Sequence, residues 1–403
     1  MRHIWRRFHS MRAQSNASRA DSRPWKDAAS LIIATPADKT NSTKYPSDYN
    51  ILFLKRIAKS SFFPNAYVYP GGALDPADKH SRWIEIFQNI DPQFCDNVEK
   101  EFFVYQKDGK RSPLFPGDRD ALSQGVLPNE IVFRICAIRE TFEESGLLLL
   151  TNDVQSRRLK PNSVHASSVS HLLTSDIIEK WRNKVHNDAN EFINLCIELN
   201  KVPDIWSLKE WSEWLTPVLS KNKAGKRYDT VFYSCCLQEK PQYLAHDKVE
   251  MSESIWISPA EILRRYLTED IFLAPPQILE TLKLLNFSTI KSLADYMTKR
   301  AMKGMRRLMP HFTLTKDGQI IELFPGDKQY PEGPDELIRE RDLTTLDQTF
   351  EEILNSKNRF CLPAGGDPVD RLASVLCNVE LDYDQVGPVT IKDIADLGLN
   401  SKL

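Results

Sequence analysis

The chain has 403 residues, of which 41% are hydrophobic and 27% are charged, and its formal net charge at pH 7 is −2. This composition is typical of a globular protein with one large domain or two moderate ones, and the near-neutral charge argues against bulk nucleic-acid binding. No apolar run has the length that a membrane span requires. The seven cysteines show no CxxC spacing, which is typical of reduced thiols in an intracellular protein.

The first 24 residues form a basic segment, with six arginines, several serines and no acidic residue before Asp21. This composition is typical of a mitochondrial presequence, and a disordered basic tail would share it. Globular patterning begins at Trp25. Apolar runs then predict buried strands at residues 28–35, 51–54 and 66–69.

Residues 79–128 lose this periodicity and contain scattered prolines and glycines, so we predict a loop-rich insertion there. A helix is predicted to begin at Asn129, a favourable N-cap, and to end at Gly146. Residues 170–215 are rich in tryptophan and are predicted to be mostly helical. Tryptophans at helical spacing favour core packing over contact with an adenine ring or an acyl chain.

The second half of the chain continues the alternation of strands and helices. Strands are predicted at residues 228–237 and 254–257, helices at 276–285, 289–302 and 343–354, and a hairpin at 311–323. Ser258 and Glu261 have the spacing of a capping box that opens a further helix. The adjacent Cys235 and Cys236 lie in an apolar run, which favours core packing over redox chemistry.

This alternation places the main domain in the mixed α/β class. We divide the chain into a basic segment at residues 1–24, a main domain at 25–300 with insertions at 79–128 and 165–215, and a C-terminal extension at 301–403. No internal repeat is found in the sequence.

The helix predicted from Asn129 carries three closely spaced carboxylates, Glu140, Glu143 and Glu144. At about 100° per residue they fall opposite an apolar stripe on the same helix. A solvated helix usually intersperses lysines to neutralise such charges, but the cation nearest in sequence is Arg139. Helix geometry leaves two interpretations open, a solvated face and a metal site.

Within this helix, residues 139–147 read Arg-Glu-x-x-Glu-Glu-x-Gly followed by leucine. This spacing resembles the second half of the Nudix box. The loop that ends at Asp78 resembles the first half, with Gly72 as the motif glycine. Asp78 stands where the box has its first glutamate, and sixty residues separate it from Arg139 where the box has seven.

Two readings of this split box are open. Asp78 and the long insertion, together with Thr141 in place of an apolar residue, favour a catalytically inactive nucleotide-binding module. An insertion between loop and helix is also compatible with an active enzyme, because added residues cost little free energy when the loop ends stay close. The intact segment from Arg139 to Gly146 favours the enzyme.

The likeness extends beyond the box to one branch of the family, the acyl-coenzyme A diphosphatases. The segments that carry it begin at Trp25, Phe133, Asp204, Trp211 and Arg227. It runs to about Asp327, and residues 328–400 resemble nothing we can identify.

This resemblance implies a Nudix α/β/α sandwich that hydrolyses the diphosphate of coenzyme A and acyl-CoAs. The expected products are adenosine 3′,5′-bisphosphate and (acyl-)4′-phosphopantetheine. The box specifies cleavage of a diphosphate but not the groups attached to it. A pyrophosphatase for another nucleotide, such as ADP-ribose or NADH, is therefore the alternative enzyme.

The resemblance also assigns roles to residues of the box. Mg²⁺ or Mn²⁺ is the expected cofactor, because these hard ions take oxygen ligands and neutralise a diphosphate. Glu140 and Glu144 are the predicted primary ligands, and the carbonyl of Gly71 is a further one. Glu143 is either a third ligand or a catalytic residue paired with Arg139.

Two residues outside the box complete the predicted site. Glu250 is the candidate general base, with a solvent-exposed loop acid as the alternative. Arg56 is expected to contact the nucleotide phosphates, with a plain surface arginine as the alternative.

The terminal tripeptide Ser401-Lys402-Leu403 is a peroxisomal address read by an import receptor. We therefore expect a mainly peroxisomal protein with a minor mitochondrial pool.

Overall fold

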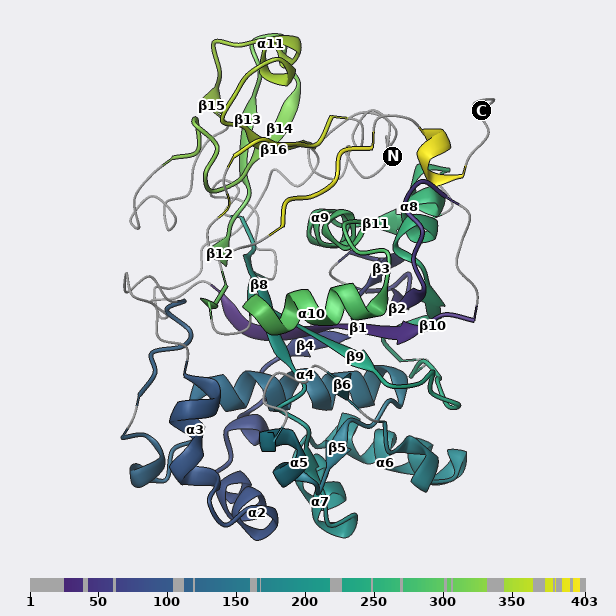
Figure 1. Cartoon of the computed structure of the whole chain (residues 1–403), viewed down its shortest axis with the longest axis vertical. Helices are drawn as coiled ribbons and strands as arrows, with labels where there is room; N and C mark the ends of the chain where they lie inside the picture. The colour runs from purple at the N-terminus through teal and green to yellow at the C-terminus, as the bar shows by residue number, and fades with distance from the viewer. Residues whose placement is uncertain are drawn as a thin grey trace.

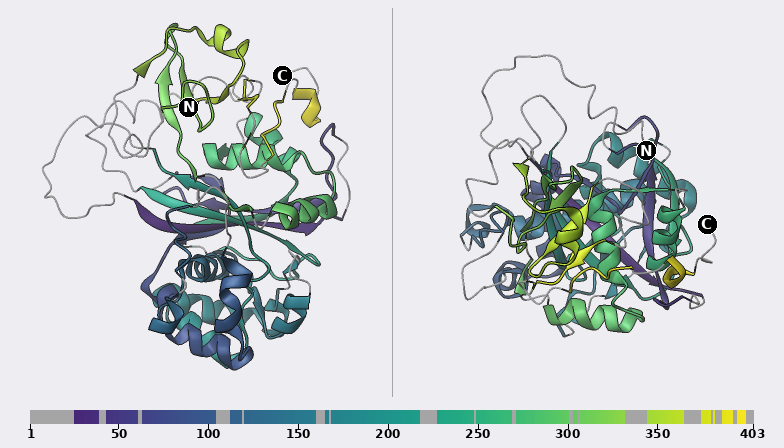
Figure 2. Two further views of the ribbon diagram at one scale, coloured as in Figure 1. Left: turned by 60° about the vertical axis from the view of Figure 1, so that its left-hand side comes forward. Right: turned by 90° about the horizontal axis from the view of Figure 1, so that it is seen from above.

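The computed structural model describes residues 25–38, 43–60, 63–103, 112–118, 120–159, 165–166, 168–217, 227–247, 249–268, 271–300, 303–305, 307–331, 344–364, 374–379, 381, 386–391 and 394–398. The basic segment and the terminal tripeptide lie outside these residues. A mixed sheet occupies the middle of the molecule, with helices on both faces (Figure 1). Figure 2 shows this sheet edge-on between the two helical layers. The predicted mixed α/β class is confirmed.

The central sheet has the strand order β11-β3-β2-β1-β9-β8-β12, with β10 paired to β2, β4 to β1 and β6 to β9. The bounds are β1 Lys26–Pro36, β2 Tyr49–Arg56, β3 Ala66–Val68, β4 Gly71–Ala73, β6 His165–Ala166, β8 Lys209–Leu215, β9 Tyr228–Leu237, β10 Met251–Ile257, β11 Phe272–Leu273 and β12 Arg307–Leu308. β1 and β9 run parallel at the centre, and β2 is antiparallel to β1. The strands predicted in these regions are confirmed, with ends shifted by a few residues.

Strand β1 separates two hydrophobic cores. Leu31 and Ile33 belong to the first core, whereas Ile32 and Ala34 belong to the second, and all four side chains are fully buried. Successive side chains of a strand point to opposite faces, so an uninterrupted apolar run needs a layer on each side. Helix α4, Asn129–Ser145, covers the first face. The second face is covered by α8 Pro259–Leu267, α9 Pro275–Leu284 and α10 Ile290–Arg300.

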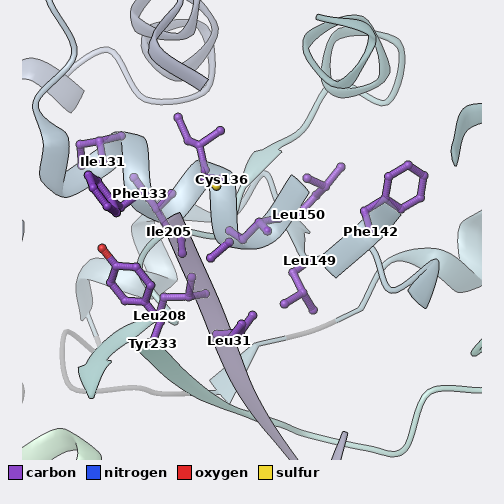
Figure 3. Close-up of a cluster of buried hydrophobic side chains, with 14 of the residues drawn as sticks. Leu31, Ile131, Phe133, Cys136, Phe142, Leu149, Leu150, Ile205, Leu208 and Tyr233 are labelled. Carbon is purple, nitrogen blue, oxygen red and sulfur yellow. The ribbon is translucent and has the colours of Figure 1, made fainter. Parts of the chain in front are cut away.

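Helix α4 is buried on all sides, unlike the predicted helix with one apolar face and one exposed face. Figure 3 shows its side chains Ile131, Phe133 and Phe142 packed in the first core with Leu31 of β1. Helices of the insertions lie on the side of α4 that faces away from the sheet (Figure 1), and Glu143 and Glu144 of α4 are buried. The N-cap is Pro128 rather than Asn129. The side-chain Nδ2 of Asn129 instead donates to the carbonyl of Leu114.

The insertion at residues 79–128 was predicted to be loop-rich, and this prediction is wrong. The segment forms α2 Arg82–Ile90, α3 Phe94–Phe102 and a short 3₁₀ helix η2 Leu122–Gln124. Phe87, Phe94 and Phe102 pack around the ring of Trp206, at ring-centroid distances of 5.9, 6.5 and 6.1 Å. Helices of this length are marginal in isolation, so their stability comes from these tertiary contacts rather than from the local sequence.

The segment 170–215 is helical only in its first part. The 3₁₀ helix η3 Ser170–Leu172 and the helices α6 Ser175–Asn187 and α7 Glu191–Glu198 follow α5 Val154–Leu159, and β7 Val202–Pro203 then pairs with β5 Leu150–Thr151. Trp211 and Trp214 lie on strand β8, where both are buried. The prediction of helix for residues 202–215 is therefore wrong, whereas the predicted core packing of these tryptophans agrees with the structure.

A buried carboxylate joins β8 to helix α9. Glu280 is fully buried and accepts hydrogen bonds from Nε1 of Trp211 at 2.6 Å and Nε1 of Trp214 at 2.7 Å. Ser212 Oγ donates to it at 2.8 Å, and Lys283 Nζ lies 3.1 Å away. The pairing of β8 with β9 shifts register at this point, which lets adjacent residues of β8 reach the same acceptor.

The C-terminal residues form a five-stranded sheet beyond α8, α9 and α10 (Figure 1). Its order is β15-β13-β14-β16-β17, with bounds Thr344–Thr345, His311–Leu314, Ile320–Leu323, Phe360–Pro363 and Leu376–Cys377. Phe324 and Phe360 belong to the second core, so this sheet packs against the main domain. The predicted hairpin is confirmed. The predicted helix at 343–354 is reduced to α11 Phe350–Leu354, and the 3₁₀ helix η7 Ile394–Leu397 follows.

Helix α8 begins at the predicted N-cap. Ser258 Oγ accepts a hydrogen bond from the amide of Glu261 at 3.3 Å. The Glu261 carboxylate pairs with Arg264 and Arg265 rather than returning to the cap, so the capping box is only half formed. Of the helices that the structure describes, none combines the length and apolar character needed to cross a membrane.

We expect Glu280→Ala to lower the free energy of unfolding by about 3–5 kcal/mol, because removing one partner leaves Lys283 and two indole N–H groups buried without their acceptor. Urea denaturation followed by tryptophan fluorescence measures this change. Glu261→Ala is the matched control, since its ion pairs are partly exposed and contribute less than about 1 kcal/mol. Equal losses in the two variants would contradict the role assigned to Glu280.

Candidate active site

The two halves of the split box meet in the structure. The amide of Gly71 donates to Glu144 Oε2 at 2.8 Å, which ties β4 directly to α4. A Cβ atom added to Gly72 would lie 2.5 Å from Cδ of Glu140. The long insertion therefore leaves the loop and the helix in contact, as the split-box interpretation requires.

Close packing explains the two glycines. Gly71 and Gly72 pair with Ser30 and Ala29 of β1, while α4 covers the other side of β4. A Cβ atom at Gly71 would lie 2.3 Å from the carbonyl oxygen of Ala29, and its φ of +150° is rare for residues with side chains. No side chain fits at either position without moving the strand or a carboxylate.

Arg139 organises the acidic side chains of the box. Its Nε and Nη2 donate to the two carboxylate oxygens of Asp78, both at 2.8 Å. Its Nη1 donates to Glu140 at 2.9 Å and to Glu143 at 2.6 Å. Asp78 therefore serves as the bidentate partner of a buried arginine. An aspartate in place of the first glutamate of the box is therefore compatible with an intact site.

The carboxylates of α4 carry more negative charge than Arg139 balances. Burial raises the pKa of Glu140 to about 7, although Arg139 opposes the shift. Burial and the neighbouring Glu140 raise the pKa of Glu144 well above its usual value. A divalent cation would offset this charge, and carboxylate oxygens are the ligands that Mg²⁺ and Mn²⁺ prefer. The donor set therefore fits such an ion.

The carboxylates predicted to bind a metal ion do not surround one common point. Within the part of the chain that the structure describes, no three carboxylate, imidazole or thiol groups are arranged as a metal centre. Hydrogen bonds to the protein use one oxygen of each carboxylate: Arg139 donates to Oε1 of Glu140 and of Glu143, and the amide of Gly71 donates to Oε2 of Glu144.

A cavity of about 390 Å³ opens beside the box and brings Glu250 to it. Its walls include Glu140, Glu143 and Glu144 of α4, and Asp247 and Glu250 lie on the opposite loop. The predicted general base is therefore placed with the box, although its role is a prediction that the geometry does not test.

Arg56 does not line this cavity, but it lies near the box. Its charge lowers the pKa of Glu144, while Nε donates to Ser60 Oγ at 2.9 Å. Its expected contact with substrate phosphates stays a prediction. Burial raises the pKa of Tyr228, at the start of β9, while Arg56 opposes this shift and Glu250 adds to it.

Helix α6 supplies site residues that sequence reasoning missed. His186, in its last turn, lines the cavity with Nδ1 3.8 Å from Glu143 Oε2. Arg182 fixes this helix to α4, because Nε and Nη2 both donate to the carbonyl of Glu143, at 3.0 and 2.8 Å. A cation at the last carbonyls of a helix is favourable. No motif marks His186, so the sequence alone offered no signal for it.

Comparison with known proteins extends the similarity from the box to most of the chain. The family model for the NUDT19 Nudix domain matches residues 25–284, and the model for the NUDT19 C-terminal domain matches residues 313–361. The chain is 39% identical over 373 residues to acyl-coenzyme A diphosphatase NUDT19 of Gallus gallus, and the match covers 92% of this chain and 96% of that protein.

The Homo sapiens protein of the same name is 33% identical over 344 residues, with 83% of this chain and 88% of that protein covered. Among solved structures, a NUDIX hydrolase from Alicyclobacillus acidocaldarius shares 17% sequence identity with the chain. That comparison covers 68% of this chain and 97% of that chain, with a TM-score of 0.45.

We expect Gly72→Ala to weaken Mn²⁺ binding by at least about tenfold, because the added Cβ displaces the Glu140 carboxylate. Isothermal titration calorimetry with Mn²⁺ measures the affinity. Gly125→Ala is the control, since nothing lies within 4 Å of the atom added there. Wild-type affinity in Gly72→Ala would remove Glu140 from the ligand set.

Proposed function

Because the chain belongs to the NUDT19 family of Nudix hydrolases, we propose that its substrates are coenzyme A and acyl-CoAs. As a Nudix diphosphatase it adds water across a phosphoanhydride bond. With these substrates the products are adenosine 3′,5′-bisphosphate and (acyl-)4′-phosphopantetheine. The activity in the names of the chicken and human relatives supports this choice of substrate. The observation that carries the diphosphatase activity itself is the contact between the two halves of the box, at Gly71 and Glu144.

Nudix hydrolases generally use divalent metal ions, and we propose Mg²⁺ or Mn²⁺ here. When bound, such an ion neutralises the diphosphate and makes water more acidic. Glu140 and Glu144 would hold it, with the carbonyl of Gly71 as a further ligand. Glu143 pairs with Arg139 at 2.6 Å, which favours a role in fixing the site over one as a third ligand.

The chain's other residues bind substrate and move a proton. Glu250 lies on the cavity wall opposite α4, where it would accept a proton from the attacking water. Arg56, at the end of β2, would contact the phosphates of the nucleotide half. Asp78 does not favour an inactive module, because its carboxylate has a structural task in holding Arg139.

We expect Glu144→Gln to lower kcat on coenzyme A by a factor of about 10², which corresponds to about 3 kcal/mol of lost transition-state stabilisation. Product release is measured by mass spectrometry at limiting Mg²⁺, with coenzyme A, acyl-CoAs, ADP-ribose and NADH compared in one panel. Glu351→Gln, an exposed change on α11, is the control. Near wild-type turnover in Glu144→Gln would refute the metal assignment. Preferential cleavage of ADP-ribose or NADH would refute the substrate assignment.

We also propose that the protein is mainly peroxisomal, with a minor mitochondrial pool from the basic N-terminal segment. The support is the terminal Ser401-Lys402-Leu403, which an import receptor would bind. Removing these three residues should abolish peroxisomal fluorescence of an N-terminally tagged chain in imaged cells. Retention of the truncated chain in peroxisomes would contradict the assignment.

A further inference from the structure

One carboxylate oxygen organises the loop that precedes β10. Asp247 Oδ1 accepts hydrogen bonds from the backbone amides of Val249, Glu250 and Met251, at 3.0, 3.0 and 2.8 Å. Three donors on one anionic oxygen form a strong set of hydrogen bonds and give the loop a defined backbone. Both Asp247 and Glu250 line the cavity beside the box.

The loop is also attached to the scaffold at both ends. The amide of Ala245 donates to the carbonyl of Ser145, the last residue of α4, at 3.1 Å. The amide of Ile57, just beyond β2, donates to the carbonyl of Glu250 at 2.9 Å. Asp247 lies between these two attachments. Its carboxylate therefore holds the backbone amides of residues 249–251, next to the attachment at Glu250.

The side chain of Glu250 is exposed, and no hydrogen bond to its carboxylate is recorded among the described residues. Glu250 lines the same cavity as Glu140 and Glu144 of α4. Its charge acts on Glu144 and on Tyr228 of β9, and the charge of Arg56 on β2 acts on the same two residues in the opposite sense. Glu250 raises the pKa of Glu144, which agrees with its place on the shared cavity. The backbone of the loop therefore sets the point from which the Glu250 side chain extends towards the cavity.

We propose that Asp247 is a positioning residue for the hydrolysis, acting through Glu250. This inference rests on the proposed function. In the step concerned, an O–H bond of water breaks and its proton passes to the Glu250 carboxylate. The water oxygen bonds to one phosphorus, and the bridging P–O bond breaks to release the other phosphate. A misplacement of the proton acceptor by about 1 Å lowers such a rate by about 10².

Kinetics of the full-length chain on coenzyme A with Mg²⁺ test this role. Asp247→Ala should lower kcat by about 10–100-fold with KM nearly unchanged, because the loop loses its acceptor while the box is intact. Asp247→Asn should restore most of the rate, since its amide oxygen accepts the same three bonds. Ser252→Ala, an exposed change on the neighbouring strand, should have wild-type kcat.

A double-mutant cycle separates positioning from other roles. Glu250→Gln should be slow, and adding Asp247→Ala to it should cause no further loss of kcat. Circular dichroism and Tm of each variant show whether it is folded. If Asp247→Ala does not fold, the rate of Asp247→Asn tests the positioning role instead.

Three results would overturn this inference but not the proposed function, as long as the wild-type chain hydrolyses coenzyme A. They are wild-type kcat in Asp247→Ala, a rate in Asp247→Asn as low as in Asp247→Ala, and additive losses in the double variant. A folded wild-type chain that cleaves none of coenzyme A, ADP-ribose and NADH would overturn the proposed function and this inference together.

Discussion

The bidentate ion pair between Arg139 and Asp78 is the interaction on which the site depends. It joins two segments that sixty residues separate, and both partners are buried. Buried charges are stable only when paired and hydrogen-bonded, so this pair strongly favours one arrangement of loop and helix. The glycines of β4 then allow the strand to approach α4 closely enough for the Gly71 amide to reach Glu144. A long insertion is tolerated because this pair holds the loop before it and the helix after it together.

The same burial that stabilises α4 makes ionisation of its carboxylates costly. Three carboxylates of one helix are enclosed with a single arginine in direct contact, and burial raises the pKa of each of them. Such a cluster costs folding free energy that a cation can offset, as is common where stability and function compete. The opposite core carries no comparable cost, since Glu280 there has donors on four neighbouring residues. Glu280 is thus fully hydrogen-bonded on one side of the sheet, whereas the carboxylates of α4 on the other side have fewer cationic partners than they could bind.

Elements with a long local pattern were predictable from the sequence. The apolar runs of β1 and β9 and the periodic stretch of α4 appear close to their expected bounds. The failures concern segments whose structure depends on distant partners. Helices α2 and α3 are short and derive their stability from packing around Trp206. On strand β8, Ser212 and two indole N–H groups bond to Glu280 of α9, whereas Glu210 and Glu213 pair with Arg134 and Arg307. Local periodicity carries no information about partners that lie far along the chain.

For the site, the sequence by itself determined the chemistry: Arg139, three glutamates and two glycines at the spacing of a split Nudix box. Such a motif is readable because its residues lie on one helix and one loop, where spacing converts directly into geometry. Which groups surround them depends on the tertiary packing. His186 lies beside Glu143, and Asp247 and Glu250 of one loop line the same cavity. His186 comes from α6 and the other two from the loop before β10, so their distances depend on how α6, β2 and β10 pack around α4.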